Sequence, residues 1–344
     1  MSFAGILKKL DTDARGKLET KLPSWAGLDI QVPQSINYQQ CSSESTARYK
    51  ASLVHEGARV ADLTGGLGAD SWAFSQRASA LWFNERNAVL LDAVKHNFAH
   101  LGVQNAVFNN FDIDPSADGW MESLRAFGPD VIYLDPARRG ADGRKLFLLE
   151  DCSPDVLSLM PGLLEVAPQV MIKVSPMADI TMLRRRLEGV LRELHVVGSE
   201  GECKELLCIC GRDAEFDGVV LAEDGVVYEN VDAVSDGPML FVPSAAMVKS
   251  GLGPGMCLMG FDEGLTNFGK FYQVLENLPF ASSVIKDVGR RYPQAEVTAR
   301  GVQIGSDALR AKMKTKPGGP VHIFACILNS DRRLLICKQV LGPE

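Results

Sequence analysis

The stretch Arg59-Val-Ala-Asp-Leu-Thr-Gly-Gly-Leu-Gly-Ala-Asp70 decides the fold of this chain. An apolar run ends at Asp62, a loop with glycines at 65, 66 and 68 follows, and an amphipathic pattern begins at Ser71. This order predicts a strand, a tight turn and the start of a helix. Glycines lack a Cβ, so a ligand can approach the backbone of such a turn. Dinucleotides, phosphates and S-adenosylmethionine all bind at turns of this kind, and the turn alone leaves the ligand open.

Composition limits the classes of protein to which the chain can belong. Its 344 residues are 46% hydrophobic, which predicts two or three domains. The N-terminus lacks the pattern of a signal peptide, and no run of about 18 apolar residues occurs. The eight cysteines form no C-x-x-C pair, several of them lie in apolar runs, and the five histidines are scattered. We therefore expect a cytoplasmic protein with reduced thiols, no membrane segment and no metal site.

Charge is unevenly distributed along the chain. The net charge is −7, yet the segment from Leu278 to the C-terminus holds eleven Lys and Arg against five Asp and Glu. That segment carries +6 and the rest −13. A basic tail on an acidic body fits the docking of a polyanion such as RNA. A solvated lysine face is the alternative interpretation.

Acidic residues follow successive predicted strands. After the glycine turn, strand patterns cover 79–84, 106–109 and 130–134, and Glu85, Asp112 and Asp135 stand at or shortly beyond their ends. Strands that alternate with helices predict a parallel sheet, in which ligands gather at the carboxyl ends of the strands. An acidic residue about 20 positions after the turn, here Glu85, suits ribose hydroxyls. NAD and S-adenosylmethionine both remain open on this evidence.

Three details favour S-adenosylmethionine. The dinucleotide spacing G-x-G-x-x-G requires glycine or alanine at position 71, where this chain has Ser71. Asp62 inside the first strand suits a cationic ligand and would repel a pyrophosphate. Asp135 and Pro136 place a hydrogen-bond acceptor and a rigid turn at the end of the fourth strand.

These motifs resemble those of the class I S-adenosylmethionine-dependent methyltransferases. The family motif is D-x-G-x-G-x-G, and here Thr64 replaces the first glycine. The resemblance implies an α/β fold with a Rossmann-like, seven-stranded sheet. It also implies that Gly66 and Gly68 line the methionine part of the cofactor, that Glu85 binds the ribose and that Asp112 lies at the adenine. The predicted cofactor-binding residues are Asp62, Thr64, Gly65, Gly66, Gly68, Asp70, Glu85, Arg86 and Asp112.

Further motifs are similar to those of a bacterial subgroup with a C-terminal THUMP-like domain. They are Gln40-Cys-Ser-Ser-Glu44, Lys173-Val-Ser-Pro-Met-Ala-Asp179 and Glu202-Cys-Lys-Glu-Leu206. The resemblance implies RNA as the partner. The expected domains are an N-terminal helical segment (1–55), the methyltransferase domain (56–212), a hairpin with a ferredoxin-like module (213–278) and a THUMP-like RNA-binding domain (279–344).

The expected chemistry centres on Asp135-Pro-Ala-Arg138, which resembles the family's D-P-P-x catalytic motif with Ala137 in place of the second proline. Uracil-C5 methyltransferases share Asp-Pro-Ala-Arg but attack the base with a cysteine after the fifth strand, and Val174-Ser-Pro-Met177 contains none. We therefore expect transfer to a base nitrogen of structured RNA. The predicted catalytic residues are Asp135, Pro136, Ala137 and Arg138, and the candidate substrate contacts are Arg139, Lys173 and Ser175.

Other interpretations stay open. Arg138 and Arg139 fit a substrate phosphate and, equally, carboxylates at the rim of the pocket. The substrate could be a protein or a small molecule, with the C-terminal modules used for assembly. The chain could also be a non-catalytic RNA-binding protein that retains the cofactor.

Overall fold

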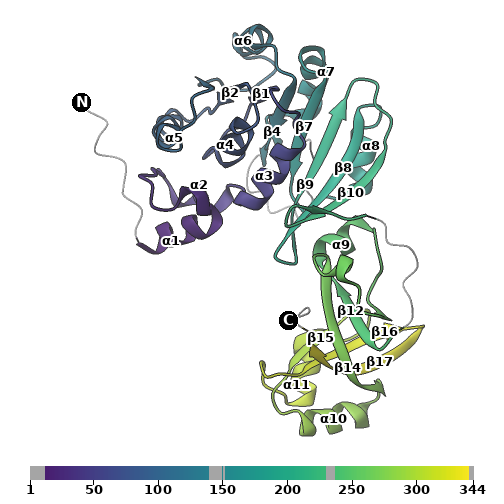
Figure 1. The fold of residues 1–344 in the computed structure, drawn as a ribbon. Helices are drawn as coiled ribbons and strands as arrows, with labels where there is room; N and C mark the ends of the chain where they lie inside the picture. The colour runs from purple at the N-terminus through teal and green to yellow at the C-terminus, as the bar shows by residue number, and fades with distance from the viewer. Residues whose placement is uncertain (1–11, 139–148, 150–151, 230–236, 341–344) are drawn as a thin grey trace. The chain divides into compact units, whose positions relative to one another are not determined.

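The protein consists of two compact units, Met1–Val227 and Tyr228–Glu344 (Figure 1). The computed structural model describes residues 12–138, 149, 152–229 and 237–340. None of the helices in these ranges has the length and apolar character needed to cross a membrane. Each unit is built on its own large sheet.

The first unit is organised around a nine-stranded sheet in the order β11-β10-β8-β9-β7-β4-β1-β2-β3. Strands β1, β2, β3, β4 and β7 are parallel, and β9 is antiparallel to both β7 and β8. The seven strands from β8 to β3 are the predicted Rossmann-like sheet, and β10 and β11 extend it. The strands are β1 (Arg59–Asp62), β2 (Ala80–Asn84), β3 (Ala106–Asn109), β4 (Val131–Leu134), β7 (Gln169–Val174), β8 (Leu191–Ser199), β9 (Glu202–Gly211), β10 (Gly218–Glu223) and β11 (Val226–Val227).

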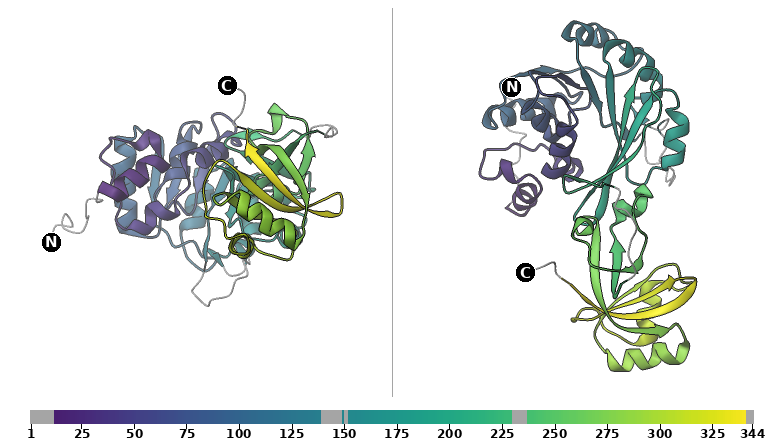
Figure 2. Two further views of the ribbon diagram at one scale, coloured as in Figure 1. Left: turned by 90° about the horizontal axis from the view of Figure 1, so that it is seen from below. Right: turned by 45° about the vertical axis from the view of Figure 1, so that its right-hand side comes forward.

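Helices cover both faces of this sheet because apolar side chains alternate along its strands. In β2, Leu81 and Phe83 join the cluster that contains helix α5, whereas the indole Nε1 of Trp82 donates to Ser123 of α6 at 3.3 Å. Helices α1 to α5 gather on one side and α8 lies on the other (Figures 1 and 2). The helices are α1 (Thr12–Lys21), α2 (Ser35–Gln40), α3 (Glu44–Ser52), α4 (Ala69–Ser75), α5 (Ala88–His100), α6 (Trp120–Phe127), α7 (Val156–Val166) and α8 (Ile180–Arg186), with a 3-10 turn η2 (Pro23–Trp25).

Local capping sets where several of these helices start. The side chain of Asn87 accepts hydrogen bonds from the N–H groups of Val89 and Leu90, and that of Ser43 accepts from Thr46. The sequence pattern over 179–191 predicts one helix, and α8 is shorter than this range. It ends at Arg186 because the chain turns through Gly189, at φ +79°, before β8 begins.

The hairpin predicted after residue 218 is present, but it belongs to the first unit. Strands β10 and β11 pair antiparallel, with Ala222 opposite Val227. Strand β10 also pairs in parallel with β8, where Val219 lies opposite Leu194. The hairpin therefore extends the large sheet, whereas the sequence placed it in the module that follows residue 212.

The second unit contains a six-stranded sheet in the order β13-β12-β14-β17-β16-β15 (Figure 1). The sequence after residue 280 predicts a helix over 283–291, a strand over 295–300, a helix over 306–314 and paired strands over 321–328 and 332–337. The structure confirms this order. The elements are β12 (Met239–Pro243), α9 (Ala245–Ser250), β13 (Cys257–Met259), η4 (Glu263–Leu265), β14 (Gly269–Pro279), α10 (Ser282–Arg291), β15 (Glu296–Ala299), α11 (Ser306–Met313), β16 (His322–Leu328) and β17 (Asp331–Gln339).

Strand β14 runs across the boundary expected at residue 278. Its first part pairs with β12, where Tyr272 lies opposite Leu240, and its second part pairs with β17, where Leu278 lies opposite Leu334. Helices α10 and α11 pack on one face of the sheet, through a core that includes Ile285. The two small modules expected from the sequence thus share one sheet.

Candidate active site

The glycine turn has the geometry that its sequence requires. Gly66 and Gly68 have φ values of +54° and +88°, in the left-handed region that favours glycine. A Cβ on Gly65 would lie 2.2 Å from the ring of Phe83, so bulk is excluded there as well. At Gly66, in contrast, the nearest atom to such a Cβ is a backbone oxygen 3.9 Å away. That side of the turn is open to a ligand.

Asp62 fixes the two ends of this turn. Its carboxylate accepts a hydrogen bond from the N–H of Thr64 at 2.9 Å and another from the hydroxyl of Ser71 at 2.6 Å. The side chain is buried, and burial raises the pKa of Asp62 to about 7 against these two hydrogen bonds. A cationic ligand nearby would favour the ionised carboxylate.

Glu85 connects the second strand end to the turn. Its Oε2 accepts from the N–H of Gly66 at 3.0 Å and its Oε1 from the N–H of Asn87 at 2.8 Å. Both partners are backbone groups and the residue is half-buried, so the carboxylate keeps lone pairs for hydroxyl groups. This position and chemistry suit a ribose diol.

The loop after β3 lies beside Glu85. The side-chain amide of Asn110 donates to the carbonyl oxygens of Glu85 and Arg86, at 2.6 and 3.0 Å. Asp112 lies in this loop with its side chain 73% exposed, and its Oδ1 is 4.0 Å from the guanidinium of Arg86. An ion pair that is this exposed adds little to stability, but it places Asp112 and Arg86 together beside Glu85.

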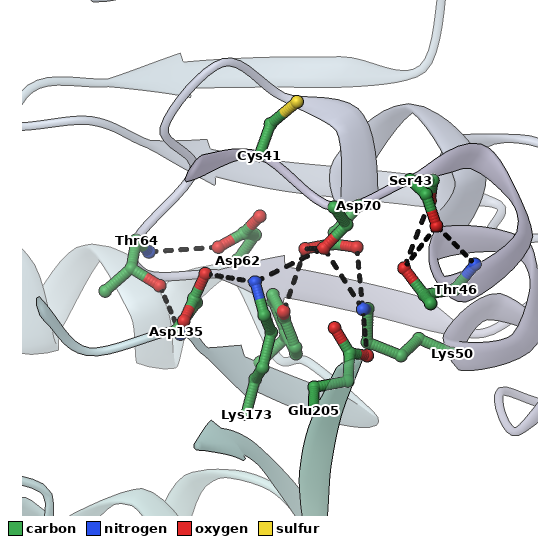
Figure 3. Close-up of polar contacts among 12 residues, drawn as sticks. Cys41, Ser43, Thr46, Lys50, Asp62, Thr64, Asp70, Asp135, Lys173 and Glu205 are labelled. Atoms are coloured by element: carbon green, nitrogen blue, oxygen red, sulfur yellow. Dashed lines mark hydrogen bonds and ion pairs between the residues drawn. The ribbon is translucent and has the colours of Figure 1, made fainter. Parts of the chain in front are cut away.

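Asp135 lies at the end of β4 and is held from two sides. Its backbone N–H donates to Thr64 Oγ1 at 2.6 Å, so the threonine at the position of the expected first glycine joins the turn to the Asp135-Pro-Ala-Arg138 stretch. One carboxylate oxygen, Oδ2, accepts from Lys173 Nζ at 2.6 Å (Figure 3). Lys173, near the end of β7, also donates to Ser42 Oγ at 3.3 Å.

Lys173 gives this edge of the sheet a lasting positive charge. Its side chain is only 13% exposed, and such burial by itself would lower the pKa. The carboxylates of Asp135 and Asp70 outweigh burial and raise the pKa of Lys173 above its usual value. The ammonium group therefore stays charged beside Asp135.

Asp70 lies beneath the turn, in a buried network. Its Oδ2 accepts from the hydroxyls of Ser42 and Tyr133 at 2.8 and 2.9 Å. Its Oδ1 is 3.2 Å from Lys50 Nζ (Figure 3). Burial acts to raise the pKa of Asp70, but Lys50 and Lys173 together hold it below its usual value. The sequence had placed Asp70 at the cofactor, whereas its carboxylate is enclosed by protein groups.

Lys50 and Glu205 complete this network, and the sequence analysis identified neither as part of the site. Lys50 is fully buried and forms ion pairs with both Asp70 and Glu205. Burial raises the pKa of Glu205, and this effect is larger than the opposite effect of the Lys50 charge. Two features of the sequence could have indicated these residues. Lys50 lies on the apolar side of a short helix, and Glu205 directly precedes the buried run Leu206–Cys210.

The remaining predicted residues follow Asp135 or β7. Pro136 is half-buried, and exposed Ala137 begins β5 (Ala137–Arg138), which pairs with β6 (Cys152–Ser153). The side chain of Arg138 and the whole of Arg139 lie outside the described structure. Ser175 Oγ accepts from the N–H of Met177 at 3.2 Å.

The donor set fits S-adenosylmethionine. The open side of Gly66 offers bare backbone to the methionine part, and Glu85 offers acceptors to the ribose. The carboxyl groups of Asp62 and Asp135 surround the same turn and suit the positive charge of the sulfonium.

Comparisons with known proteins agree with this geometry. Residues 269–339 match the family model described as THUMP domain-like. Two uncharacterized S-adenosylmethionine-dependent methyltransferases, from two strains of Mycobacterium tuberculosis, are 24% identical over 96% of this chain and 94% of their own length. The crystal structure of a protein assigned as a methyltransferase from Porphyromonas gingivalis superposes with a TM-score of 0.80. That protein is 26% identical, over 96% of this chain and 89% of its own.

The sheet order, the glycine turn and these relatives agree on one family. The likeness covers nearly the whole length of this chain and of the Mycobacterium relatives. The chain has the fold of the class I S-adenosylmethionine-dependent methyltransferases, is similar to such proteins over nearly its whole length, and matches a THUMP-like domain at residues 269–339.

Proposed function

We propose that this enzyme transfers the methyl group of S-adenosylmethionine to a base nitrogen of structured RNA. The observation that carries the proposal is the THUMP-like match at 269–339, because domains of that kind bind RNA elsewhere. The match covers the part of the chain that is rich in lysine and arginine. The charges of the second unit and the chemistry of Asp135 support the same substrate.

The basic residues of the second unit divide into neutralised and free groups. Arg291 contacts Glu276 at 2.7 Å, Arg290 contacts Asp287 at 3.5 Å, and Arg310 pairs with Asp307. Lys312, Lys314 and Lys316, at the end of α11 and in the loop after it, are exposed and form no ion pair within the described part of the unit. Free lysines of this kind bind phosphates, which position a nucleic acid without reading its sequence.

Asp135 is suited to an amine substrate. Among the residues that the structure describes, Lys173 is the one side chain that donates to its carboxylate, and it uses Oδ2. The other oxygen can accept an N–H of an exocyclic amine, which would orient the nitrogen lone pair toward the methyl donor. Its charge would also stabilise the positive charge that develops on that nitrogen. When bound, S-adenosylmethionine supplies a methyl group on a positively charged sulfur.

The wall beside Asp135 also bears on the substrate. Pro136 gives a rigid, half-buried turn, and Val174-Ser-Pro-Met177 lacks the cysteine of covalent C5 chemistry. A base nitrogen in a duplex would have to leave the stack to reach Asp135, so loops or unpaired nucleotides are the preferred targets.

A transfer assay tests the chemistry. RNA from cells that lack the gene is incubated with labelled S-adenosylmethionine and with wild type, Asp135→Ala or Asp135→Asn. We expect both variants to lose at least about 100-fold in rate while they still bind S-adenosylhomocysteine. The control is Asp92→Asn, because Asp92 is exposed and contacts only Lys95, at 3.3 Å, among the described side chains. Undiminished RNA methylation by Asp135→Ala would refute the proposal.

A binding assay tests the RNA partner. Substitution of Lys312, Lys314 and Lys316 by glutamine should weaken RNA binding and reduce the slope of log K against log salt by about 2 to 3. The matched control is Arg290→Gln with Arg310→Gln, since those guanidinium groups already have carboxylate partners. Equal losses in both variants would argue against the lysine cluster.

Two other functions make different predictions. A methyltransferase for a protein or small molecule would turn over without RNA and would not show salt-sensitive RNA binding. A non-catalytic RNA-binding protein would bind the cofactor without turnover. None of the eight cysteines is in a disulfide, which fits a reducing compartment.

A further inference from the structure

We propose that Asp29, His96 and His100 form a binding site for a divalent transition metal, with Zn²⁺ as the best-suited ion. The site lies between the segment that precedes α2 and the C-terminal end of α5. One donor atom from each of the three side chains lies within 4.8 Å of the other two. The sequence analysis expected no metal because it treated the five histidines as scattered.

The two histidines stand one helical turn apart on the same face of α5. Their ring centroids are 4.2 Å apart. Two histidines at positions i and i+4 of a helix are a spacing that zinc sites use. The apolar pattern over 87–101 predicts a helix, and within that helix His96 and His100 have this spacing.

Asp29 adds a carboxylate from a distant part of the chain. Its Oδ2 is 3.3 Å from His96 Nε2. In a tetrahedral site with metal-to-ligand distances of about 2.0–2.2 Å, neighbouring ligand atoms are about 3.3–3.5 Å apart. The Asp29 and His96 atoms therefore already have the spacing of two zinc ligands, and a ring nitrogen of His100 lies within 4.8 Å of both.

Hydrogen bonds prepare the third ligand. His100 Nδ1 is 2.9 Å from the carbonyl oxygen of His96. An N–H at Nδ1 that donates to this oxygen leaves the lone pair of Nε2 free for a metal. His96 Nε2 is 2.9 Å from the backbone oxygen of Asp29, so the metal would replace the proton shared there.

The backbone around Asp29 is held in place independently of the histidines. The buried side chain of Asn97 accepts from the N–H of Gln31 at 2.7 Å and donates to the Gln31 carbonyl at 2.9 Å. This double hydrogen bond fastens the 29–31 segment to α5. The carboxylate therefore faces the histidines without a conformational change of the chain.

The donor set selects among metals. Two imidazoles and one carboxylate suit Zn²⁺ and similar transition metals, whereas Mg²⁺ and Ca²⁺ prefer oxygen ligands. Asp29 and His100 are exposed, so an ion can enter and a water molecule can take the fourth position. A bound ion would join the N-terminal segment to the helix that starts three residues after Glu85.

Metal titration of the full chain tests the site. Wild type should bind one Zn²⁺ by calorimetry and should melt at a higher temperature with Zn²⁺ than without it. In His100→Ala and in Asp29→Asn we expect at least about a tenfold weaker Kd and no rise in melting temperature. His55→Ala is the matched control, because His55 is also exposed and lies outside the cluster.

Two further measurements keep the outcome unambiguous. The chain also has eight cysteines, which could bind metal in place of the proposed site. Because Asp29, His96 and His100 contain no sulfur, the spectrum of the Co²⁺-loaded protein should lack sulfur-to-metal charge-transfer bands. Circular dichroism verifies that each variant is folded, and His100→Gln replaces His100→Ala if that variant fails to fold. Wild-type affinity in the folded His100 variant, or thiolate bands in the cobalt spectrum, would overturn the proposal.

Discussion

Lys173 Nζ lies 2.6 Å from Asp135 Oδ2, although 38 residues separate the two in the chain. The parallel pairing of β4 with β7, which sets Leu134 opposite Ile172, brings the two strand ends together. The ion pair orients one oxygen of the proposed catalytic carboxylate and leaves the other available. Lys173 therefore acts as a positioning residue in the proposed reaction.

Replacement of Lys173 by methionine should reduce kcat for methyl transfer by about 100-fold, because Asp135 would lose its fixed orientation. Lys173→Arg keeps the charge and should recover part of the rate. Separate measurement of kcat and KM distinguishes this role from a loss of substrate binding, which would raise KM alone. Lys204→Met is the control, since Lys204 pairs at the surface with Glu202. A Lys173→Met enzyme with unchanged kcat would contradict the assignment.

Lys50 should be more important for stability than either of its carboxylate partners. Lys50→Met leaves Asp70 and Glu205 buried without their shared counter-charge, and we expect a loss of about 3–5 kcal/mol in the free energy of unfolding. Glu205→Gln removes only one partner and should cost less. Urea unfolding of both variants and of the double variant measures the coupling. If the two single losses add up in the double variant, the pair is not coupled as proposed.

Asp62 should make the stability of the first unit depend on pH. Its pKa is raised to about 7 by burial, so between roughly pH 4 and pH 7 the folded state binds more protons than the unfolded state. Stability should therefore fall as the pH rises through that window, by up to about 4 kcal/mol for a shift of about three units.

Asp62→Asn should remove most of this fall, because an amide does not titrate in this pH range. The variant should still fold, since the amide oxygen can accept from Thr64 and the amide N–H₂ can donate to Ser71. Urea unfolding at pH 5 and pH 8 measures the difference in both proteins. An unchanged difference between the two pH values in the variant would show that other groups cause the dependence.

Glu85 should determine the affinity for the cofactor's ribose. We expect Glu85→Gln to weaken the binding of S-adenosylhomocysteine by about tenfold, because a neutral amide is a weaker acceptor for hydroxyl groups than a carboxylate. Calorimetry measures the Kd of each protein. Glu56→Gln is the control, since that residue is exposed and contacts Arg77 at 3.5 Å. Equal affinity in Glu85→Gln and wild type would place the ribose elsewhere.

Local patterns in the sequence were enough to predict the parallel sheet. The strands that end at Asp62, Asn84 and Leu134 fall where apolar runs meet polar residues, and the caps at Ser43 and Asn87 agree with their helices. These features depend on neighbours a few positions apart. The same range of interactions explains why the helix and strand order after residue 280 was predicted correctly.

Contacts over long separations could not be predicted in this way. Lys50 and Glu205 are 155 residues apart, and the sequence around each residue does not indicate that the two form a pair. The hairpin of β10 and β11 was recognised, but its parallel pairing with β8 depends on an edge that forms only in the folded sheet. Asp29 and the two histidines of α5 come together for the same reason.

Strand β14 has a practical consequence for anyone who excises the THUMP-like domain. The family match begins at Gly269, the first residue of this strand, and the first half of the strand forms its ladder with β12. A fragment cut at that point would expose an unpaired edge along Gly269–Gln273, and open edges recruit strands from other molecules. We therefore expect such a fragment to aggregate, and a fragment that retains Met239–Pro243 to remain monodisperse.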